Sequence, residues 1–354
     1  MSKRLVQQRI SLLSLFGFSL LFAFTTTPGP TRAEIIKEEQ AHFATRVKTP
    51  VYEWRNPAVK PKAVAIAVHG LTLHGGIYDA LARHLSAEGF IVLAPDLHGY
   101  GRWLTQDNEK TRCPDCGSHL CYSKSRSDLV ELIDSTSEAY PDLPLYLIGE
   151  SLGADMVLYS VTQRPHLVDG MILSSPAIKR RLNLVPRVAK DAAFVMQNPF
   201  KKLDLAPYIK MFASEDPRIV NEALSDPLVR KKLSVWDLLK TSQTIRPTLK
   251  YADQIPPDMP VLIIQGDKDR MLKSNAVVQL LEHLNSSDQT VRWFKGKGHL
   301  LLETAYLEPD LLNIMDGWLK EHLDSSRVMR ASAAVVGKIK APGESESEAE
   351  AKTN

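Results

Sequence analysis

The sequence predicts a doubly wound α/β fold with a mostly parallel sheet, and two observations lead to this prediction. Short apolar runs bounded by turn residues alternate with helical patterns along most of the 354-residue chain. The runs are continuously apolar, which is typical of strands covered on both faces. One interruption of the alternation, over residues 178–254, has helical but no strand-like pattern and predicts a helical cap insertion.

The expected strands are residues 64–68, 91–94, 145–148, 171–173, 261–264 and 291–294. Helices are expected at residues 77–86, 152–162, 275–284 and 311–323. In the last helix, Leu312, Met315 and Leu319 recur at spacings of three and four, which indicates one face packed on the sheet. The aromatic and methionine side chains of the cap either pack it onto the body or line a pocket for an acyl chain; they are Phe194, Met196, Phe200, Tyr208, Met211 and Phe212.

Two terminal segments are expected outside the folded domain, which we assign to residues 34–324. Residues 1–33 contain no acidic residue and combine a basic start with an almost unbroken apolar run over residues 10–24. A secretory signal peptide fits this pattern, as does an uncleaved membrane anchor or a buried helix. We therefore expect an exported or membrane-anchored protein. The low-complexity acidic end predicts a disordered tail over residues 325–354.

The composition excludes one class of function and leaves the cysteines open. A net charge of +3, with no Lys and Arg stripe among aromatic residues, argues against nucleic-acid binding. The three cysteines, Cys113, Cys116 and Cys121, cannot all pair within one chain. With His119 they fit a zinc cage, a local disulfide or unpaired thiols.

The strongest chemical signal is Gly149-Glu150-Ser151-Leu152-Gly153, between an expected strand and an expected helix. Glycines two positions either side of the serine permit a sharp turn that a side chain would block. The turn presents the hydroxyl at the helix N-terminus, although a serine that merely caps the helix is the alternative. Ser151 is therefore the candidate nucleophile.

A hydroxyl becomes nucleophilic when a base removes its proton, so an acid and an imidazole should follow in the chain. Asp269 and His299 each follow an expected strand, where ligands bind in open α/β sheets. They are the candidate acid and base, and Asp267 is the competing acid unless it caps the turn or pairs with Lys268.

The developing oxyanion also needs hydrogen-bond donors. The backbone N–H of Leu152, directly after the nucleophile, is one candidate, and that of Leu71, in the loop after residues 64–68, is the other. His69 begins this loop and is expected to brace it by hydrogen bonds rather than to take part in catalysis.

Several motifs together resemble the monoacylglycerol lipase and lysophospholipase branch of the α/β-hydrolases, which is serine aminopeptidase S33-like. The motifs are His69-Gly70, Asp96-Leu97-His98-Gly99-Tyr100-Gly101-Arg102, the Ser151 pentapeptide, Gly266-Asp267-Lys268-Asp269 and Gly298-His299. The cap stretches 214–217 and 226–229 are also similar. The sequence departs from the family at Trp103 and in the cysteine-containing stretch that follows.

The resemblance covers roughly residues 50–323 and implies an α/β-hydrolase fold with a lid that admits single-chain lipid esters. It implies nucleophile Ser151, acid Asp269, base His299 and oxyanion donors Leu71 and Leu152, with no cofactor and no metal. The expected function is hydrolysis of monoacylglycerol or lysophospholipid esters, with the lipid as the only expected partner, met at a membrane surface. The alternatives are a small-ester carboxylesterase, an acyltransferase and a peptidase of the same fold. A non-enzymatic scaffold is disfavoured.

Overall fold

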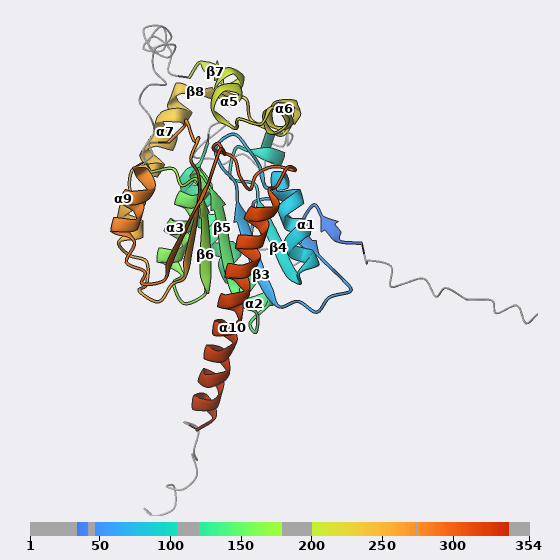
Figure 1. The fold of residues 1–354 in the computed structure, drawn as a ribbon. Coiled ribbons are helices and arrows are strands. Elements are labelled where there is room, and N and C mark those ends of the chain that lie inside the picture. The colour runs from blue at the N-terminus through green and yellow to red at the C-terminus, as the bar shows by residue number, and fades with distance from the viewer. Residues whose placement is uncertain (1–33, 42–46, 105–119, 179–199, 273–274, 340–354) are drawn as a thin grey trace, which may run out of the picture. The chain divides into compact units, whose positions relative to one another are not determined.

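A computed structural model describes residues 34–41, 47–104, 120–178, 200–272 and 275–339. Its centre is an eight-stranded sheet in the order β1-β2-β4-β3-β5-β6-β9-β10 (Figure 1). The strands are β1 (Ile36–Glu38), β2 (Val51–Arg55), β3 (Ala63–Val68), β4 (Phe90–Pro95), β5 (Leu145–Glu150), β6 (Gly170–Ser174), β9 (Val261–Gly266) and β10 (Gln289–Phe294). The strands from β4 to β10 in this order pair in parallel, and β2 pairs antiparallel with β1 and β4. The predicted mostly parallel sheet is confirmed.

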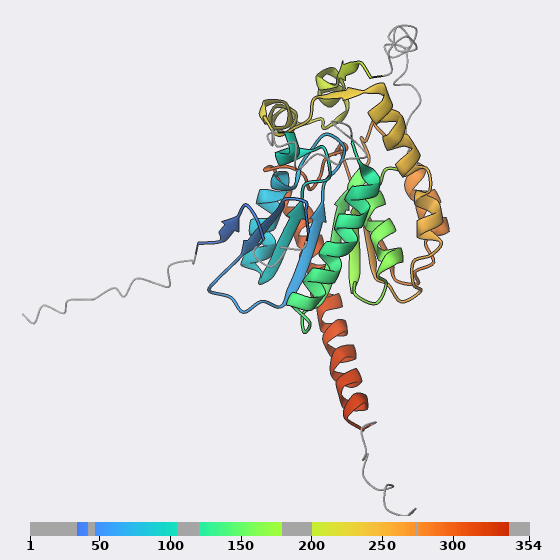
Figure 2. The same ribbon diagram turned by 180° about the vertical axis from the view of Figure 1, so that it is seen from behind.

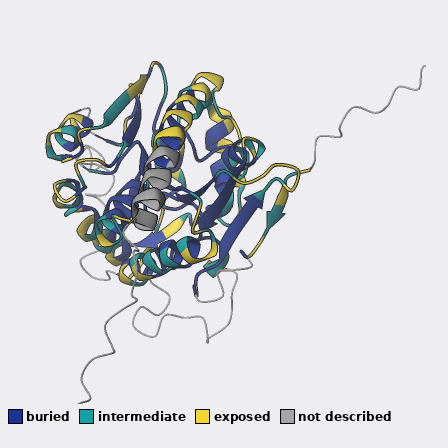
Figure 3. Ribbon diagram, turned by 90° about the horizontal axis from the view of Figure 1, so that it is seen from below, coloured by how far each residue is buried: buried dark blue, intermediate teal, exposed yellow. Residues whose placement is uncertain are grey.

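Helices cover both faces of the sheet, as Figures 1 and 2 show from opposite sides. They are α1 (Asp79–Ala87), α2 (Tyr122–Ala139), α3 (Leu152–Gln163), α9 (Ala276–His283) and α10 (Pro309–Ile339). Val64 and Val68 of β3 share an apolar core with α2, α3 and α9, whereas Ala63 and Ala67 share a second core with α1 and α10. Successive side chains of a strand point to opposite faces. The continuous apolar runs therefore reflect burial on both sides, with the exposed residues on the outer helix surfaces (Figure 3).

The segment between β6 and β9 forms a cap above the sheet (Figure 1). It contains α5 (Ala206–Phe212), α6 (Pro217–Ser225), α7 (Val235–Ile245) and α8 (Thr248–Ala252). The cap also holds an antiparallel pair, β7 (Lys202–Asp204) with β8 (Lys232–Ser234), so the expectation of a cap without strands is wrong. These strands have three residues each and alternate polar or charged with apolar side chains, so they leave no apolar run to detect. Residues 179–199, with Phe194 and Met196, lie outside the described residues.

Four further elements differ from the sequence-based expectation. Strands β1 and β2 and helix α2 are additional, and α10 continues to Ile339, through half of the tail expected to be disordered from residue 325. This part of α10 contains three alanines and no proline, and the first proline comes only at Pro342. Residues 1–33 and 340–354 lie outside the described residues. Within the described ranges, no helix combines the length and apolar character needed to span a bilayer.

Cys121, the residue before α2, is disulfide-bonded. Cys113, Cys116 and His119 lie outside the described residues. A sulfur that is already in a disulfide is not available as a zinc ligand, because the metal binds the thiolate. The state of Cys121 therefore agrees with the disulfide alternative.

We expect two of the three cysteines of the purified protein to be oxidised and one to be free. Alkylation followed by intact-mass spectrometry should add one label before reduction and two more after it. The Cys121→Ser variant is the matched control. Because the former partner of Cys121 becomes a second unpaired thiol, the variant should take both of its labels without reduction. Stoichiometric zinc that survives dialysis would contradict the disulfide and favour the cage.

Candidate active site

Ser151 lies in a sharp turn between β5 and α3. Its φ of 56° is in the left-handed region, which non-glycine residues adopt only under strain. A Cβ at Gly149 would lie 2.5 Å from the Gly153 carbonyl carbon, and a Cβ at Gly153 would lie 1.9 Å from the Val68 carbonyl oxygen. Side chains are therefore excluded at both positions, which is the physical reason for the glycine spacing in the sequence.

The structure brings the three predicted residues together in one chain of hydrogen bonds. His299 Nε2 lies 2.9 Å from Ser151 Oγ, and His299 Nδ1 lies 2.8 Å from Asp269 Oδ2. Because an ionised carboxylate only accepts hydrogen bonds, Nδ1–H donates to Asp269 and Nε2 accepts from the serine hydroxyl. All three residues are buried. This is the geometry in which an imidazole can remove the serine proton.

Asp269 is held as an ionised carboxylate. Its Oδ1 accepts from the backbone N–H of Met271 (2.8 Å) and Leu272 (3.1 Å), and its Oδ2 accepts from the Gln265 amide (3.0 Å). Burial alone would raise the pKa of Asp269, but the His299 charge and these hydrogen bonds lower it to about 2. The carboxylate can therefore stabilise a positive charge on His299 over the whole neutral pH range.

The competing acid Asp267 has a different position. Its side chain is exposed, and its Oδ1 accepts from the backbone N–H of Gly296 at 2.6 Å. Gly296 has a φ of 77° in the turn after β10. Asp267 thus closes the turn before His299 and makes no hydrogen bond with the imidazole, as the sequence-based alternative of a turn cap implies.

The loop after β3 runs directly against the nucleophile. A Cβ at Gly70 would lie 3.4 Å from Ser151 Cβ, in van der Waals contact, and only 3.0 Å from Glu303 Oε2 and 3.3 Å from the Glu150 carbonyl oxygen, so glycine suits this close approach. Leu71 and Leu152 both line the cavity that contains Ser151 and His299. The structure therefore brings the two predicted oxyanion donors to the site. We call residues 69–76 the oxyanion loop.

His69 braces the oxyanion loop, as predicted. Its Nδ1 donates to the Gly70 carbonyl (2.8 Å), and its Nε2 accepts from the backbone N–H of Leu97 (3.0 Å). Burial lowers the pKa of His69 to about 4, so the ring is neutral at physiological pH. A neutral ring can donate with one nitrogen and accept with the other.

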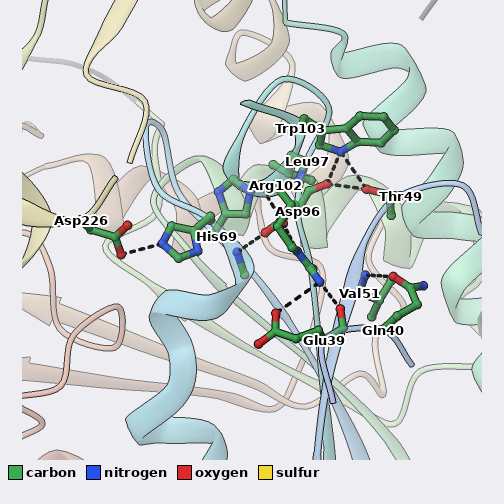
Figure 4. Close-up of polar contacts among 12 residues, drawn as sticks. Glu39, Gln40, Thr49, Val51, His69, Asp96, Leu97, Arg102, Trp103 and Asp226 are labelled. Carbon is green, nitrogen blue, oxygen red and sulfur yellow. Dashed lines mark hydrogen bonds and ion pairs between the residues drawn. The ribbon is translucent and has the colours of Figure 1, made fainter. Parts of the chain in front are cut away.

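Asp96 ties the same loop to the segment after β4 (Figure 4). Its carboxylate accepts from the backbone N–H of Gly75 (2.7 Å) and from Arg102 Nε (2.6 Å). Trp103, where the sequence departs from the family pattern, donates from its indole to the Asp96 carbonyl (3.0 Å) and stacks on His98. The segment 96–102 thus has a structural role in supporting the oxyanion loop.

The cap is attached to the oxyanion loop by two contacts. Asp226, after α6, accepts from His74 Nε2 at 2.9 Å, and the backbone N–H of Arg230 donates to the Thr72 carbonyl at 2.7 Å. Thr72 has a φ of 76°, a strained value for a β-branched residue. The cap therefore holds the loop in a conformation that the loop would not adopt alone.

A cavity of about 950 Å³ lies between the cap and the sheet and opens onto Ser151 and His299. Its volume is near the upper end for small-molecule sites. Most of its walls are apolar, and the cap contributes Leu203, Leu205, Tyr208, Ile209, Phe212, Ala213, Ala223, Leu238, Leu239 and Ile245. Tyr208 and Phe212 thus line the pocket, which was one of the two roles expected for the cap side chains. Phe200 and Met211 are instead exposed.

Sequence comparison finds one family model, described as serine aminopeptidase, S33, that matches residues 59–305. Monoglyceride lipase from Homo sapiens is 28% identical over 70% of this chain and 78% of its own length. A monoglyceride lipase homolog from monkeypox virus is 27% identical over 75% of this chain and 92% of its own. The crystal structure of Paleococcus ferrophilus monoacylglycerol lipase is 25% identical, with a TM-score of 0.59, over 82% of this chain and 99% of its own. These findings confirm the predicted resemblance and fold.

Replacing Asp269 by Asn should lower kcat by about 10⁴, because the amide favours the wrong imidazole tautomer and cannot stabilise the imidazolium. The matched control is Asp267→Asn, which should cost little because Asp267 only closes an exposed turn. Ester hydrolysis by the two purified variants gives the comparison. The reverse ranking would show that the acid has been assigned wrongly.

Proposed function

The chain belongs to the serine aminopeptidase S33 family, and on that basis we propose that it cleaves the carboxylic esters of single-chain lipids through an acyl-enzyme. Ser151 attacks the ester carbonyl, and His299 takes the serine proton and passes it to the leaving alcohol. Asp269 stabilises the imidazolium, and the N–H groups of Leu71 and Leu152 receive the oxyanion. The observation that carries the proposal is the large apolar cavity at Ser151.

The cavity favours a lipid ester over a peptide. An enzyme that binds the amino terminus of a peptide needs a carboxylate in contact with the substrate ammonium group. Among the described lining residues, Glu303 is the one carboxylate, and it is buried behind the oxyanion loop with Gly70 as its partner. Relatives named monoglyceride lipases support a glycerol monoester as the substrate, and a lysophospholipid has the same single-chain form.

The protein would meet such a substrate at a membrane surface. The cap exposes four large apolar side chains, those of Phe200, Met211, Trp236 and Leu239. Lys240 lies over the Trp236 ring, and Lys201 and Lys202 follow Phe200 in the chain. Aromatic side chains together with lysines are typical of surfaces that bind the lipid interface. An N-terminal signal or anchor over residues 1–33 would place the protein outside the cytoplasm or on its membrane.

We expect kcat/KM to rise with acyl length until the cavity is full. Each buried methylene contributes about 0.8 kcal/mol, and the part retained in the transition state increases kcat/KM. Monoesters with medium to long chains should therefore react at least about tenfold faster than acetate esters. Two-chain lipids should be poor substrates. A panel of p-nitrophenyl esters and monoacylglycerols gives the profile, and a flat or falling profile would instead favour a small-ester carboxylesterase.

The Ser151→Ala variant is the control for this panel and tests the nucleophile directly. It should fold normally, because a small residue fits the turn, but should lose hydrolysis and labelling by a fluorophosphonate probe. Unlabelled wild-type protein would favour the scaffold alternative. Residual activity above a few per cent in pure Ser151→Ala protein would exclude Ser151 as the nucleophile.

A further inference from the structure

Two glutamates beside the active site have no part in the mechanism above. Glu150 immediately precedes the nucleophile, and Glu303 lies four residues after His299. Their exposed fractions are 0% and 1%, respectively. An unpaired charge in such surroundings is costly, so two buried carboxyl groups beside each other require an explanation from their hydrogen bonds.

The contacts of Glu150 are those of an ionised carboxylate. Its oxygens accept from the backbone N–H groups of Leu301 (2.9 Å), Leu302 (3.2 Å) and Glu303 (3.0 Å), and also from the Ser174 hydroxyl. Several N–H donors to one carboxylate favour its charged form. The donors belong to the segment that directly follows His299. The residue before the nucleophile therefore holds the loop that carries the base.

The contacts of Glu303 are those of a protonated carboxyl group. Its Oε1 accepts from the backbone N–H of Gly70 at 2.6 Å. Its Oε2 is buried and receives no hydrogen bond. The backbone N–H of Glu303 donates to Glu150 Oε2 at 3.0 Å, so the two glutamates lie beside each other. A Cβ at Gly70 would lie 3.0 Å from Glu303 Oε2 and 3.3 Å from the Glu150 carbonyl oxygen. The nearby Tyr78 hydroxyl donates its proton to the Val68 carbonyl (3.0 Å). A proton on Oε2 of Glu303 satisfies this oxygen and removes the repulsion.

We propose that Glu150 and Glu303 form a carboxylate–carboxylic acid pair that positions the two halves of the active site against each other. Glu150 holds the segment after His299, and Glu303 holds Gly70 at the start of the oxyanion loop. The proton on Glu303 joins the two carboxyl groups behind Ser151. Both glutamates are positioning residues, because they act through the loops that they hold.

The electrostatics of the site agree with this assignment. Burial, followed by the charge of Glu150, raises the pKa of Glu303 well above its ordinary value, although the Gly70 N–H and the Tyr78 hydroxyl oppose that rise. Burial also raises the pKa of Glu150, but Ser174, the His299 charge and the N–H donors oppose that rise. The N–H donors to Glu150 and the unpaired Oε2 of Glu303 assign the one negative charge of the pair to Glu150. The titratable neighbours of the pair are few among the described residues. The negative charge of the pair faces His299, which also faces Asp269. Tyr78, from η1 (Gly75–Tyr78), lies near Glu303. From the cap, Glu215 lies beside Gly298.

The protonation state can be measured by infrared spectroscopy of the resting enzyme. The difference spectrum of wild-type minus Glu303→Gln protein at neutral pH should contain the C=O stretching band of a protonated carboxyl group, shifted in D₂O. Glu53→Gln is the matched control, because Glu53 is also a buried glutamate but lies on β2, where its carboxylate forms an ion pair with Arg55 (Nε to Oε1, 3.5 Å). Its difference spectrum should lack the band. No such band for Glu303 would overturn the pair. The measurement requires no turnover, so its outcome is independent of the proposed function.

Kinetics with p-nitrophenyl butyrate test the positioning role. Glu303→Ala removes the acceptor of the Gly70 N–H and should lower kcat at least about tenfold with little change in KM, the loss expected for one buried hydrogen bond. Glu303→Gln should restore most of kcat, because its oxygen can accept from Gly70 and its amide can donate to Glu150. Equal losses in both variants, or no loss in Glu303→Ala, would overturn the proposal.

Glu150→Gln gives a readout that a purely structural role would not change. Removing the charge leaves the His299 imidazolium less stabilised, so the acid limb of kcat/KM should move to lower pH while kcat falls. An unchanged acid limb would contradict a charged Glu150. Where this variant fails to fold, the infrared spectrum and the two Glu303 variants decide the proposal.

Discussion

The close approach of α3 to the end of β3 is the constraint on which the active site depends. With no side chain at Gly153, the start of α3 contacts the Val68 carbonyl, where a Cβ would lie at 1.9 Å. This contact fixes Ser151 at a positive φ beside the oxyanion loop and in front of His299. Such strain costs about 1–3 kcal/mol. It persists because β5 and most of α3 are buried in the two cores and cannot relax without losing that packing.

The central sheet could be predicted because its strands are buried on both faces and therefore read as continuous apolar runs. The edge of the sheet could not, because two charged residues, Glu53 and Arg55, interrupt the apolar run in Val51–Arg55, and Ile36–Glu38 has only three residues. Helix α2 begins directly after the cysteine-containing stretch, where polar and charged residues interrupt the apolar positions of its buried face. The nucleophile, acid and base were detectable because each follows a predicted strand. The choice between Asp267 and Asp269, by contrast, rests on two hydrogen bonds that the structure reveals.

The supporting residues of the site were not detectable in the same way. The contact between Glu303 and Gly70 joins positions 233 residues apart, and that between His74 and Asp226 joins positions 152 apart. No periodicity or motif spacing records such a pair. One signal was present, because Glu150 places a carboxylate at the end of an otherwise apolar run. A charge in a strand buried on both faces requires several donors. Those donors come from the loop after His299, which the sequence alone does not place beside it.

The cap contributes to the site in two ways. Its apolar side chains form the wall of the cavity, and its Arg230 N–H and Asp226 carboxylate hold Thr72 and His74 of the oxyanion loop. Because Thr72 is strained, the loop keeps its conformation only while these contacts persist. An acyl chain bound in the cavity, as we propose, would pack against the cap and stabilise it in the position that maintains these contacts. Binding energy from the acyl chain, far from the ester, can in this way support the geometry of the oxyanion site. Hydrogen bonds at that site strengthen in the transition state and therefore increase the rate.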